Sequence, residues 1–453
     1  MVEIPEFFAI LQKTTVTHFQ YEMKCPLFIT MLFLFVGCTK TDSNVSLTII
    51  VSGDTEGWIV PCGCTSNQSG GLPRRATFID EQRKQGLVIL ADVGGTPSGT
   101  TVYDKLKFEA ILRGQAVMGV AAHNIGQAEA ACGIDELQRL SERWQTPWVS
   151  ANTTDAAGKP LVPPAKIITS GNKKILFIGV LSQKYATESV RVTPPRRAVL
   201  KVLQEHTGKY DYVIVLAYVP EEELWELAEN LPETDAVVGG PTGQPVPPTY
   251  PQGSVLMISA TKQGKFLAVL TLPKTDKKIP GKIIELDERF ADDPVQIDNV
   301  KTFYTELKQH DFLPGDTPFV RQPLIPTEAV AGSKACQDCH NDEYRIWRVS
   351  LHANAWESLV KQEAQYDPDC QRCHVTGYGQ IGGFSSVALS SERFDVGCES
   401  CHGGSEVHRR TTSVVTPVGN RAKDRCLNCH DRENSPYFEY DAYWNKIRHG
   451  TVE

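Results

Sequence analysis

Short apolar runs rich in β-branched residues alternate with helical patterns between residues 45 and 290. The runs predict strands at 46–52, 87–92, 148–152, 175–181, 213–218, 236–239, 255–259 and 266–272. Between the runs, apolar residues recur every three or four positions, for example at 75–85 and 134–144, as on one face of a helix. Strands that alternate with helices are typical of a layered α/β domain. We therefore expect an α/β layered sandwich over residues 45–290, called the front domain below.

The pattern changes after residue 290. An apolar period at 295–309 predicts a helix, and a Pro-punctuated linker follows it up to residue 330. Residues 331–453 contain few apolar runs, so we expect a mainly α segment there. The clearest period in that segment joins Tyr344, Trp347, Leu351, Ala355 and Leu359, and it predicts one amphipathic helix.

The N-terminal 44 residues resemble neither part. Residues 1–22 carry no targeting pattern and are interpreted as a dispensable leader. An apolar run from Pro26 to Val36 follows Lys24; a bilayer span needs about 20 residues, so this shorter run fits a signal-peptide core. It ends in FVGC, which resembles a bacterial lipoprotein cleavage box and implies a lipid on Cys38, with residues 39–44 as a tether. An ordinary signal peptide with a coincidental cysteine is the alternative.

Composition narrows the function classes. An apolar content of 41% is enough for a buried core, and a net charge of −8 argues against nucleic acid as a partner. The signal pattern predicts a periplasmic or cell-envelope protein. If Cys38 is lipidated, the protein is anchored to a membrane on the side that faces away from the cytoplasm.

The pattern Cys-x-x-Cys-His occurs four times in the C-terminal segment. Two thiols three positions apart can add to the two vinyl groups of one porphyrin, and the next residue can ligate the iron. Zinc sites rarely have a His directly after every Cys-x-x-Cys pair, and a redox dithiol has no need of four copies of the motif. The sequence therefore predicts four covalently bound haem c groups. The attachment residues are Cys336, Cys339, Cys370, Cys373, Cys398, Cys401, Cys426 and Cys429, and the proximal iron ligands are His340, His374, His402 and His430. Covalent haem attachment in bacteria takes place outside the cytoplasmic membrane, which agrees with export.

Three further histidines, His352, His408 and His449, lie in the same segment, which contains no methionine. We expect them to be distal iron ligands, and bis-His ligation generally gives low reduction potentials. Three distal histidines for four haems leave one iron that is either open or ligated from outside the segment, with His310 the nearest spare.

The C-terminal half resembles a known family through ACQDCHNDEYRIWRVSLHANAW, the CHGGSEVH turn and IRHG. It is similar to the tetrahaem cytochrome c family that accepts electrons from hydroxylamine oxidoreductase. The resemblance implies three bis-His haems, one five-coordinate haem, close haem pairs and exchange of electrons with a redox partner protein. It also implies a mainly α domain in which the haems form much of the core.

The front domain resembles the 5′-nucleotidase branch of the metallophosphoesterases. The likeness rests on SGDTEGWIVPCGCTSNQSGGLPRRATFIDEQRK, LADVGG, NIGQAEAACG, VLAYVP and VVGGPTG. That family binds two metals through Asp-x-His, Gly-Asp, Gly-Asn-His-Glu, a later His and Gly-His-x-His. In this chain Asp54 keeps the Asp of the Asp-x-His motif, and Glu56 replaces its His. Gly95 stands at the position of the Asp in the Gly-Asp motif. At the family's other histidine positions, this chain has Ala128, Tyr218, Pro241 and Gly243.

A two-metal phosphoesterase needs both ions to activate its nucleophile, so this resemblance predicts an inactive front domain. Oxygen ligands from Asp54, Glu56 and Asp92 would hold at most one magnesium or calcium ion. We also expect either Cys62 or Cys64 to form a disulfide with Cys132 in an oxidising compartment.

The leading hypothesis is an exported tetrahaem cytochrome c that transfers electrons. Two alternatives stay open: a haem enzyme that acts on a small nitrogen or oxygen species at one open iron, and a 5′-nucleotidase-like phosphoesterase.

Overall fold

The computed structural model describes residues 46–61, 68–251, 253–273, 278–319, 328–412 and 422–449. The predictions for the leader, the signal peptide, Cys38 and the tether fall outside these residues, as do Cys62 and Cys64. Within the described ranges, no helix has both the length and the apolar character that a membrane span requires.

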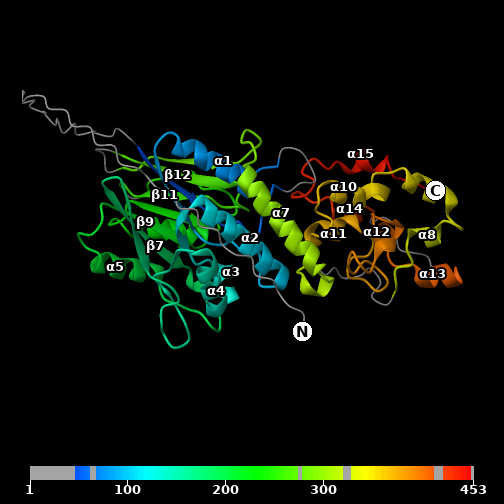
Figure 1. Ribbon diagram of the computed structural model, residues 1–453, viewed down its shortest axis with the longest axis horizontal. Coiled ribbons are helices and arrows are strands. Elements are labelled where there is room, and N and C mark those ends of the chain that lie inside the picture. The colour runs from blue at the N-terminus through cyan, green and yellow to red at the C-terminus, as the bar shows by residue number, and fades with distance from the viewer. Residues whose placement is uncertain are drawn as a thin grey trace, which may run out of the picture. The chain divides into compact units, whose positions relative to one another are not determined.

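The front domain contains two sheets (Figure 1). The first has the strand order β13-β12-β1-β2-β3-β4 and the second β11-β10-β9-β7-β6. The strands of the first are β1 (Leu47–Ser52), β2 (Leu87–Asp92), β3 (Val120–Asn124), β4 (Trp148–Val149), β12 (Phe266–Leu272) and β13 (Gly281–Glu285). Those of the second are β6 (Ala165–Ser170), β7 (Lys173–Leu181), β9 (Tyr212–Tyr218), β10 (Ala236–Gly240) and β11 (Leu256–Ser259). A short pair, β5 (Thr153–Thr154) with β8 (Arg191–Val192), lies apart from both sheets.

Alternation along the strands places one core between the two sheets and one core outside each sheet. In β1, Ile49 and Val51 face the core between the sheets, whereas Ile50 faces the helices, because successive strand residues point to opposite sides. In β7, Phe177 faces the inner core and Leu176 the outer one. The domain is therefore a four-layer α/β sandwich, as predicted.

The outer layers are helical. Helices α1 (Leu72–Arg83), α2 (Val102–Met118) and α7 (Pro294–His310) cover the first sheet, and α5 (Pro195–Glu205) and α6 (Glu221–Glu229) cover the second. Helices α3 (Gln127–Cys132) and α4 (Ile134–Trp144) follow β3, and a 3₁₀ turn, η1, spans Gln183–Tyr185.

Most of the predicted strands coincide with observed ones. The run at 148–152 is a strand only at Trp148–Val149. The pattern missed β3, whose sequence VAAHN ends in two polar residues that are nonetheless fully buried. It also missed β6 and β13, which are only half-buried at the sheet edges.

The segment from residue 328 onward, the haem segment, consists of short helices joined by turns. They are α8 (Ser333–Cys336), α9 (Asn341–Arg348), α10 (Ala355–Lys361), α11 (Pro368–His374), α12 (Cys398–His402), α13 (Glu406–Thr411), α14 (Ala422–Cys426) and α15 (Tyr440–Trp444), with 3₁₀ turns η3 (His352–Asn354) and η4 (Ser391–Arg393). A further 3₁₀ turn, η2 (Pro314–Asp316), lies before this segment. Among the described residues of this segment, the apolar core cluster has three buried members, Val375, Tyr378 and Phe384. Such a small core agrees with a segment whose interior is built around cofactors.

The single amphipathic helix predicted from Tyr344 to Leu359 is wrong. The structure divides it into α9, η3 and α10. The Trp347 indole donates to Val396 O at 2.8 Å, and Val396 N donates to His352 O at 3.0 Å. These bonds to a distant segment interrupt the helix, so α9 ends at Arg348 and His352 begins the 3₁₀ turn η3.

Candidate functional site

Three pairs of histidines face one another in the haem segment. The ring centroids are 6.1 Å apart for His340 and His408, 6.2 Å for His352 and His430, and 5.8 Å for His402 and His449. Each pair joins the histidine of one CxxCH motif to one of the three predicted distal ligands. The sequence identified all six residues but not which of them face one another.

The spacing of the pairs fits a metal between two imidazoles. Rings stacked in parallel would have centroids about 3.5–4 Å apart, whereas these pairs are farther apart and tilted by 35–42°. Two metal–histidine bonds of about 2 Å each, together with the half-width of each ring, account for the separations observed. These residues therefore fit haem groups ligated from both sides.

Hydrogen bonds at Nδ1 orient several of these rings. His430 Nδ1 lies 3.0 Å from Ser435 Oγ, His449 Nδ1 lies 2.9 Å from Ile447 O, and His374 Nδ1 lies 2.8 Å from Ala355 O. A partner on Nδ1 fixes the ring and leaves Nε2 for a metal.

A glycine turn brings His408 to His340. Gly403 has φ +79°, and a Cβ at Gly404 would lie 2.7 Å from Glu328 O, so side chains are excluded there. The Glu399 carboxylate, inside CESCH, accepts hydrogen bonds from the backbone N–H groups of Ala331 (2.7 Å) and Ser405 (2.9 Å). It thereby ties the third motif to the start of the first.

The attachment thiols of different motifs are neighbours. A hydrogen bond from the Cys336 thiol lowers the pKa of Cys398 to about 7, and burial followed by the nearby Cys426 and Cys429 raises the pKa of Cys401 to about 11. Helix α12 packs against both α8 and α14. The third attachment site therefore lies between the first and the fourth.

Three further side chains outside the haem segment could ligate an iron, namely His310, Met118 and Met257. The His310 ring stacks on Phe312 at 4.9 Å, and Met118 and Met257 are buried in the outer cores of the front domain. Each of the three distal histidines faces the histidine of one motif, and the motifs concerned are the first, the third and the fourth. Motif two carries His374, whose Nδ1 lies 2.8 Å from Ala355 O and 3.3 Å from Ser358 Oγ.

The former metal region of the front domain lies where parallel strands end together. Strands β1 and β2 are parallel, as are β9 and β10, so Asp54, Gly95, Tyr218 and Gly240 meet at their carboxyl ends. Asp54 is buried and accepts hydrogen bonds from the hydroxyls of Thr261 and, at 3.5 Å, Tyr218. Burial raises the pKa of Asp54 despite these donors.

Tyr218 fills the space that a metal ligand would need. A Cβ at Gly95 would lie 2.5 Å from Tyr218 Cε2 and 3.1 Å from Asp54 Cα. A side chain at position 95 would therefore collide with the Tyr218 ring.

The expected magnesium or calcium site at Asp54, Glu56 and Asp92 is not supported. Asp92 is fully buried and accepts hydrogen bonds from Ser52 Oγ (2.6 Å), Gln115 Nε2 (2.9 Å) and Gly94 N (2.8 Å), so its oxygens are already satisfied. Within the described ranges, no group of three or more His, Cys, Asp and Glu side chains is arranged to hold a metal ion.

Two buried residues beside this region were missed. His123 Nε2 lies 3.2 Å from Thr96 Oγ1 and 3.6 Å from Glu129 Oε1, and Glu129 also accepts from the backbone N–H of Gly95 and Thr96. Glu129 could have been found, because NIGQAE keeps the acid of Gly-Asn-His-Glu. Both side chains are fully buried and serve to hold the loop after β2.

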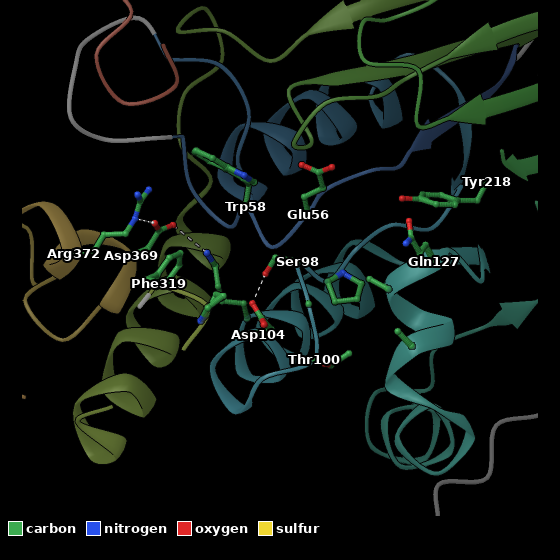
Figure 2. Close-up of a pocket in the computed structure, with 16 residues that line it drawn as sticks. Glu56, Trp58, Ser98, Thr100, Asp104, Gln127, Tyr218, Phe319, Asp369 and Arg372 are labelled. Atoms are coloured by element: carbon green, nitrogen blue, oxygen red, sulfur yellow. Dashed lines mark hydrogen bonds and ion pairs between the residues drawn. The ribbon is translucent and has the colours of Figure 1, made fainter. Parts of the chain in front are cut away.

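A cavity of about 620 Å³ opens beside Tyr218 (Figure 2). Glu56, Gln127 and Tyr218 line its front-domain end, and Asp369 and Arg372 of α11 line the other. Glu56 is exposed to the cavity, where partial desolvation, and then the carboxylates of Asp54 and Glu433, raise its pKa to about 7. Cys132 Sγ lies 4.0 Å from Gly99 O, and its two predicted disulfide partners lie outside the described residues.

Comparisons with known proteins identify both parts. Residues 335–403 match the family described as cytochrome c554 and c-prime. Cytochrome c-554 of Nitrosomonas europaea is 31% identical over 150 residues, covering 26% of this chain and 64% of that protein. The 5′-nucleotidase of Vibrio cholerae is 26% identical over 238 residues, covering 46% of this chain and 42% of that protein. The chain thus spans less than two thirds of each of these relatives.

Solved structures resemble the front domain. The 5′-nucleotidase precursor of Thermus thermophilus superposes with a TM-score of 0.52 at 19% identity, over 59% of this chain and 60% of that one. The calcineurin-like phosphoesterase YfkN of Bacillus subtilis gives 0.50 at 18% identity, over 58% of this chain and 97% of that one. At such identities the likeness establishes the fold. The chain therefore joins a domain with the 5′-nucleotidase type of metallophosphoesterase fold to a multihaem cytochrome c segment similar to cytochrome c554, and such a segment implies covalently bound haem c.

Proposed function

We propose that this protein is an exported tetrahaem cytochrome c that transfers electrons to and from redox partner proteins. The observation that carries the proposal is the set of three facing histidine pairs, each of which includes a CxxCH histidine. Paired imidazoles close both sides of an iron, which favours electron transfer over binding of a substrate.

The chain's residues would hold and orient the cofactors, which supply one-electron chemistry when bound. The eight motif cysteines attach them, and the motif histidines ligate from one side. His408, His352 and His449 ligate from the other side in the first, fourth and third motifs respectively. Hydrogen bonds at Nδ1 keep His430 and His449 in a fixed orientation.

The second motif differs from the other three. The three distal histidines serve other motifs, and the two methionines of the front domain are buried in its cores. We propose that the haem on Cys370 and Cys373 receives no sixth ligand from these residues. This favours, as a second candidate function, the binding of a small nitrogen or oxygen species at that iron.

The front domain would have no phosphoesterase activity. Within the described part of the chain, its remaining acidic residues do not form a metal site, and Tyr218 occupies the space beside Asp54. We therefore propose no role for the front domain in nucleotide cleavage.

The proposals for the location and the anchor rest on the sequence pattern from Lys24 to Cys38 alone. The protein would be periplasmic or attached to the cell envelope, with a lipid on Cys38 at the membrane and no nucleic-acid partner. Labelling with a radioactive fatty acid, in the wild type and in Cys38→Ala, would test the anchor; incorporation that persists in Cys38→Ala would contradict it.

Mass spectrometry of the protein purified from an exporting host tests the haem count. We expect a mass increase of four haems, and three in a variant in which Cys398 and Cys401 are both replaced by Ala. A wild-type increase of two haems or fewer would contradict the proposed function.

A further inference from the structure

The helix of the second CxxCH motif packs directly on the front domain. Tyr103, in the first turn of α2, donates a hydrogen bond from its hydroxyl to Asp367 Oδ1 at 2.6 Å. Tyr103 is fully buried and Asp367 is 8% exposed. Edge contacts with Phe312 and Phe319, at 5.8 and 5.5 Å, fix the tyrosine ring.

Asp367 determines where that helix begins. It is the N-cap residue of α11, and its side chain accepts a hydrogen bond from Asp369 N at 3.0 Å. N-caps of this kind satisfy one of the helix's free N–H groups and define its first turn. The motif cysteines, Cys370 and Cys373, follow within that same helix, so the tyrosine holds the end of the element that attaches the haem.

A second contact lies one helical turn farther along α2. Lys107 Nζ lies 3.6 Å from Asp369 Oδ2, and Asp369 accepts a hydrogen bond from Arg372 Nε at 2.8 Å. Figure 2 shows Asp369 and Arg372 at the α11 end of the cavity, with the interaction between them as a dashed line. Against the effect of burial, Lys107 and Arg372 hold the pKa of Asp369 below its usual range.

These contacts differ from ordinary surface ion pairs. The side chain of Lys107 is only 12% exposed, and a charge so far removed from water needs its partner. The front domain makes a similar ion pair with the fourth motif, where Lys265 Nζ lies 2.9 Å from Glu433 Oε2 and the side chains are 13% and 38% exposed. The contact with the second motif differs because it also includes the buried hydrogen bond from Tyr103 to Asp367.

We propose that the phosphoesterase-like domain serves as a scaffold for the second haem-attachment helix, with Tyr103 and Lys107 as positioning residues that set the orientation of α11 and the reduction potential of the haem attached to it. The inference rests on the proposed function, because it requires a haem on Cys370 and Cys373. It gives the front domain a role that needs no metal and no substrate.

Potentiometric titration of the full-length, matured protein tests the proposal. Reduction adds an electron, and a nearby positive charge favours it. Lys107→Met should therefore lower the potential of one haem of the four, and Lys107→Arg should restore it. Tyr103→Phe should change the potential or the spin state of the same haem, or reduce the haem count by one, and leave the other three unchanged.

Two matched variants serve as controls. Lys105→Met removes the same charge from the same helix, but Lys105 interacts with Glu136 of α4. Tyr212→Phe removes another tyrosine hydroxyl of the front domain, which donates to Pro273 O at 3.1 Å. Both should leave all four potentials unchanged.

Unchanged potentials in Lys107→Met and Tyr103→Phe would overturn the inference, as would an equal shift of all four haems or the same shift in Lys105→Met. If Tyr103→Phe fails to mature, Lys107→Met and Lys107→Arg still decide. A matured protein without covalent haem would instead contradict the proposed function, so the two failures are distinguishable.

Discussion

The imidazole of His408 faces that of His340 with 6.1 Å between ring centroids. The two histidines come from different CxxCH neighbourhoods, the third and the first, and the Gly403-Gly404 turn allows the chain to bring them together. Glu399 holds the same turn through backbone hydrogen bonds. This facing pair joins the third motif to the first, so the two motifs are parts of one structural unit rather than separate sites.

Replacing His408 should therefore affect a haem that the third motif does not attach. In His408→Ala, the haem on Cys336 and Cys339 loses its distal imidazole, so we expect one additional high-spin haem per chain. Carbon monoxide titration of the reduced protein should show one additional equivalent bound. His206→Ala, a change in the front domain at a ring that hydrogen-bonds Val202 O of its own helix, should bind the same amount as the wild type. No gain in His408→Ala would show that the pairing is incorrect.

The front domain should not hydrolyse phosphate esters. We expect no turnover of AMP or bis(p-nitrophenyl) phosphate above background with manganese, zinc or magnesium, because Tyr218 fills the space beside Asp54 and Gly95. Colorimetric phosphate release and nitrophenol absorbance provide the measurement. Metal-dependent activity that disappears in Asp54→Asn would contradict this expectation.

Glu56 should make stability depend on pH in a defined window. Its pKa in the folded protein is about 7, raised from 4.5, so between these values the folded state binds more protons than the unfolded state. The free energy of unfolding should therefore fall as pH rises from 4.5 to 7, and stay lower above it. Glu56→Gln removes this contribution.

The measurement is the difference in Tm between Glu56→Gln and the wild type. It should be small at pH 4.5, grow in favour of the variant up to pH 7, and then level off. Glu222→Gln on the exposed start of α6 is the matched control and should show no trend. A difference that does not vary with pH would show that the carboxyl titrates normally.

Local patterns predicted much of the fold. The strands β1, β2, β7, β9 and β12 are apolar runs of ordinary length, and each CxxCH motif carries its chemistry within a single short stretch of sequence. The break after Arg348 was not predictable, because it depends on hydrogen bonds that join Trp347 and His352 to Val396. Apolar periodicity records only which face is buried, and not which distant backbone groups compete with the helix.

The same limit applies to the candidate site. The composition of the haem segment identified His352, His408 and His449, yet their pairing is a tertiary property. His123 was missed because a histidine within a short apolar run carries no signal of its carboxylate neighbours. The contact of Tyr103 with Asp367 joins residues far apart in sequence, and neither position shows a motif.

The central claim is that four haems are present and that three have paired histidines. Electron paramagnetic resonance of the oxidised, matured protein, with spins quantified against the haem count from mass spectrometry, tests it most directly. The account predicts three low-spin haems with bis-His g-values and one high-spin haem per chain. Four low-spin haems would contradict the assignment of the second motif, and fewer than three low-spin haems would contradict the histidine pairs themselves.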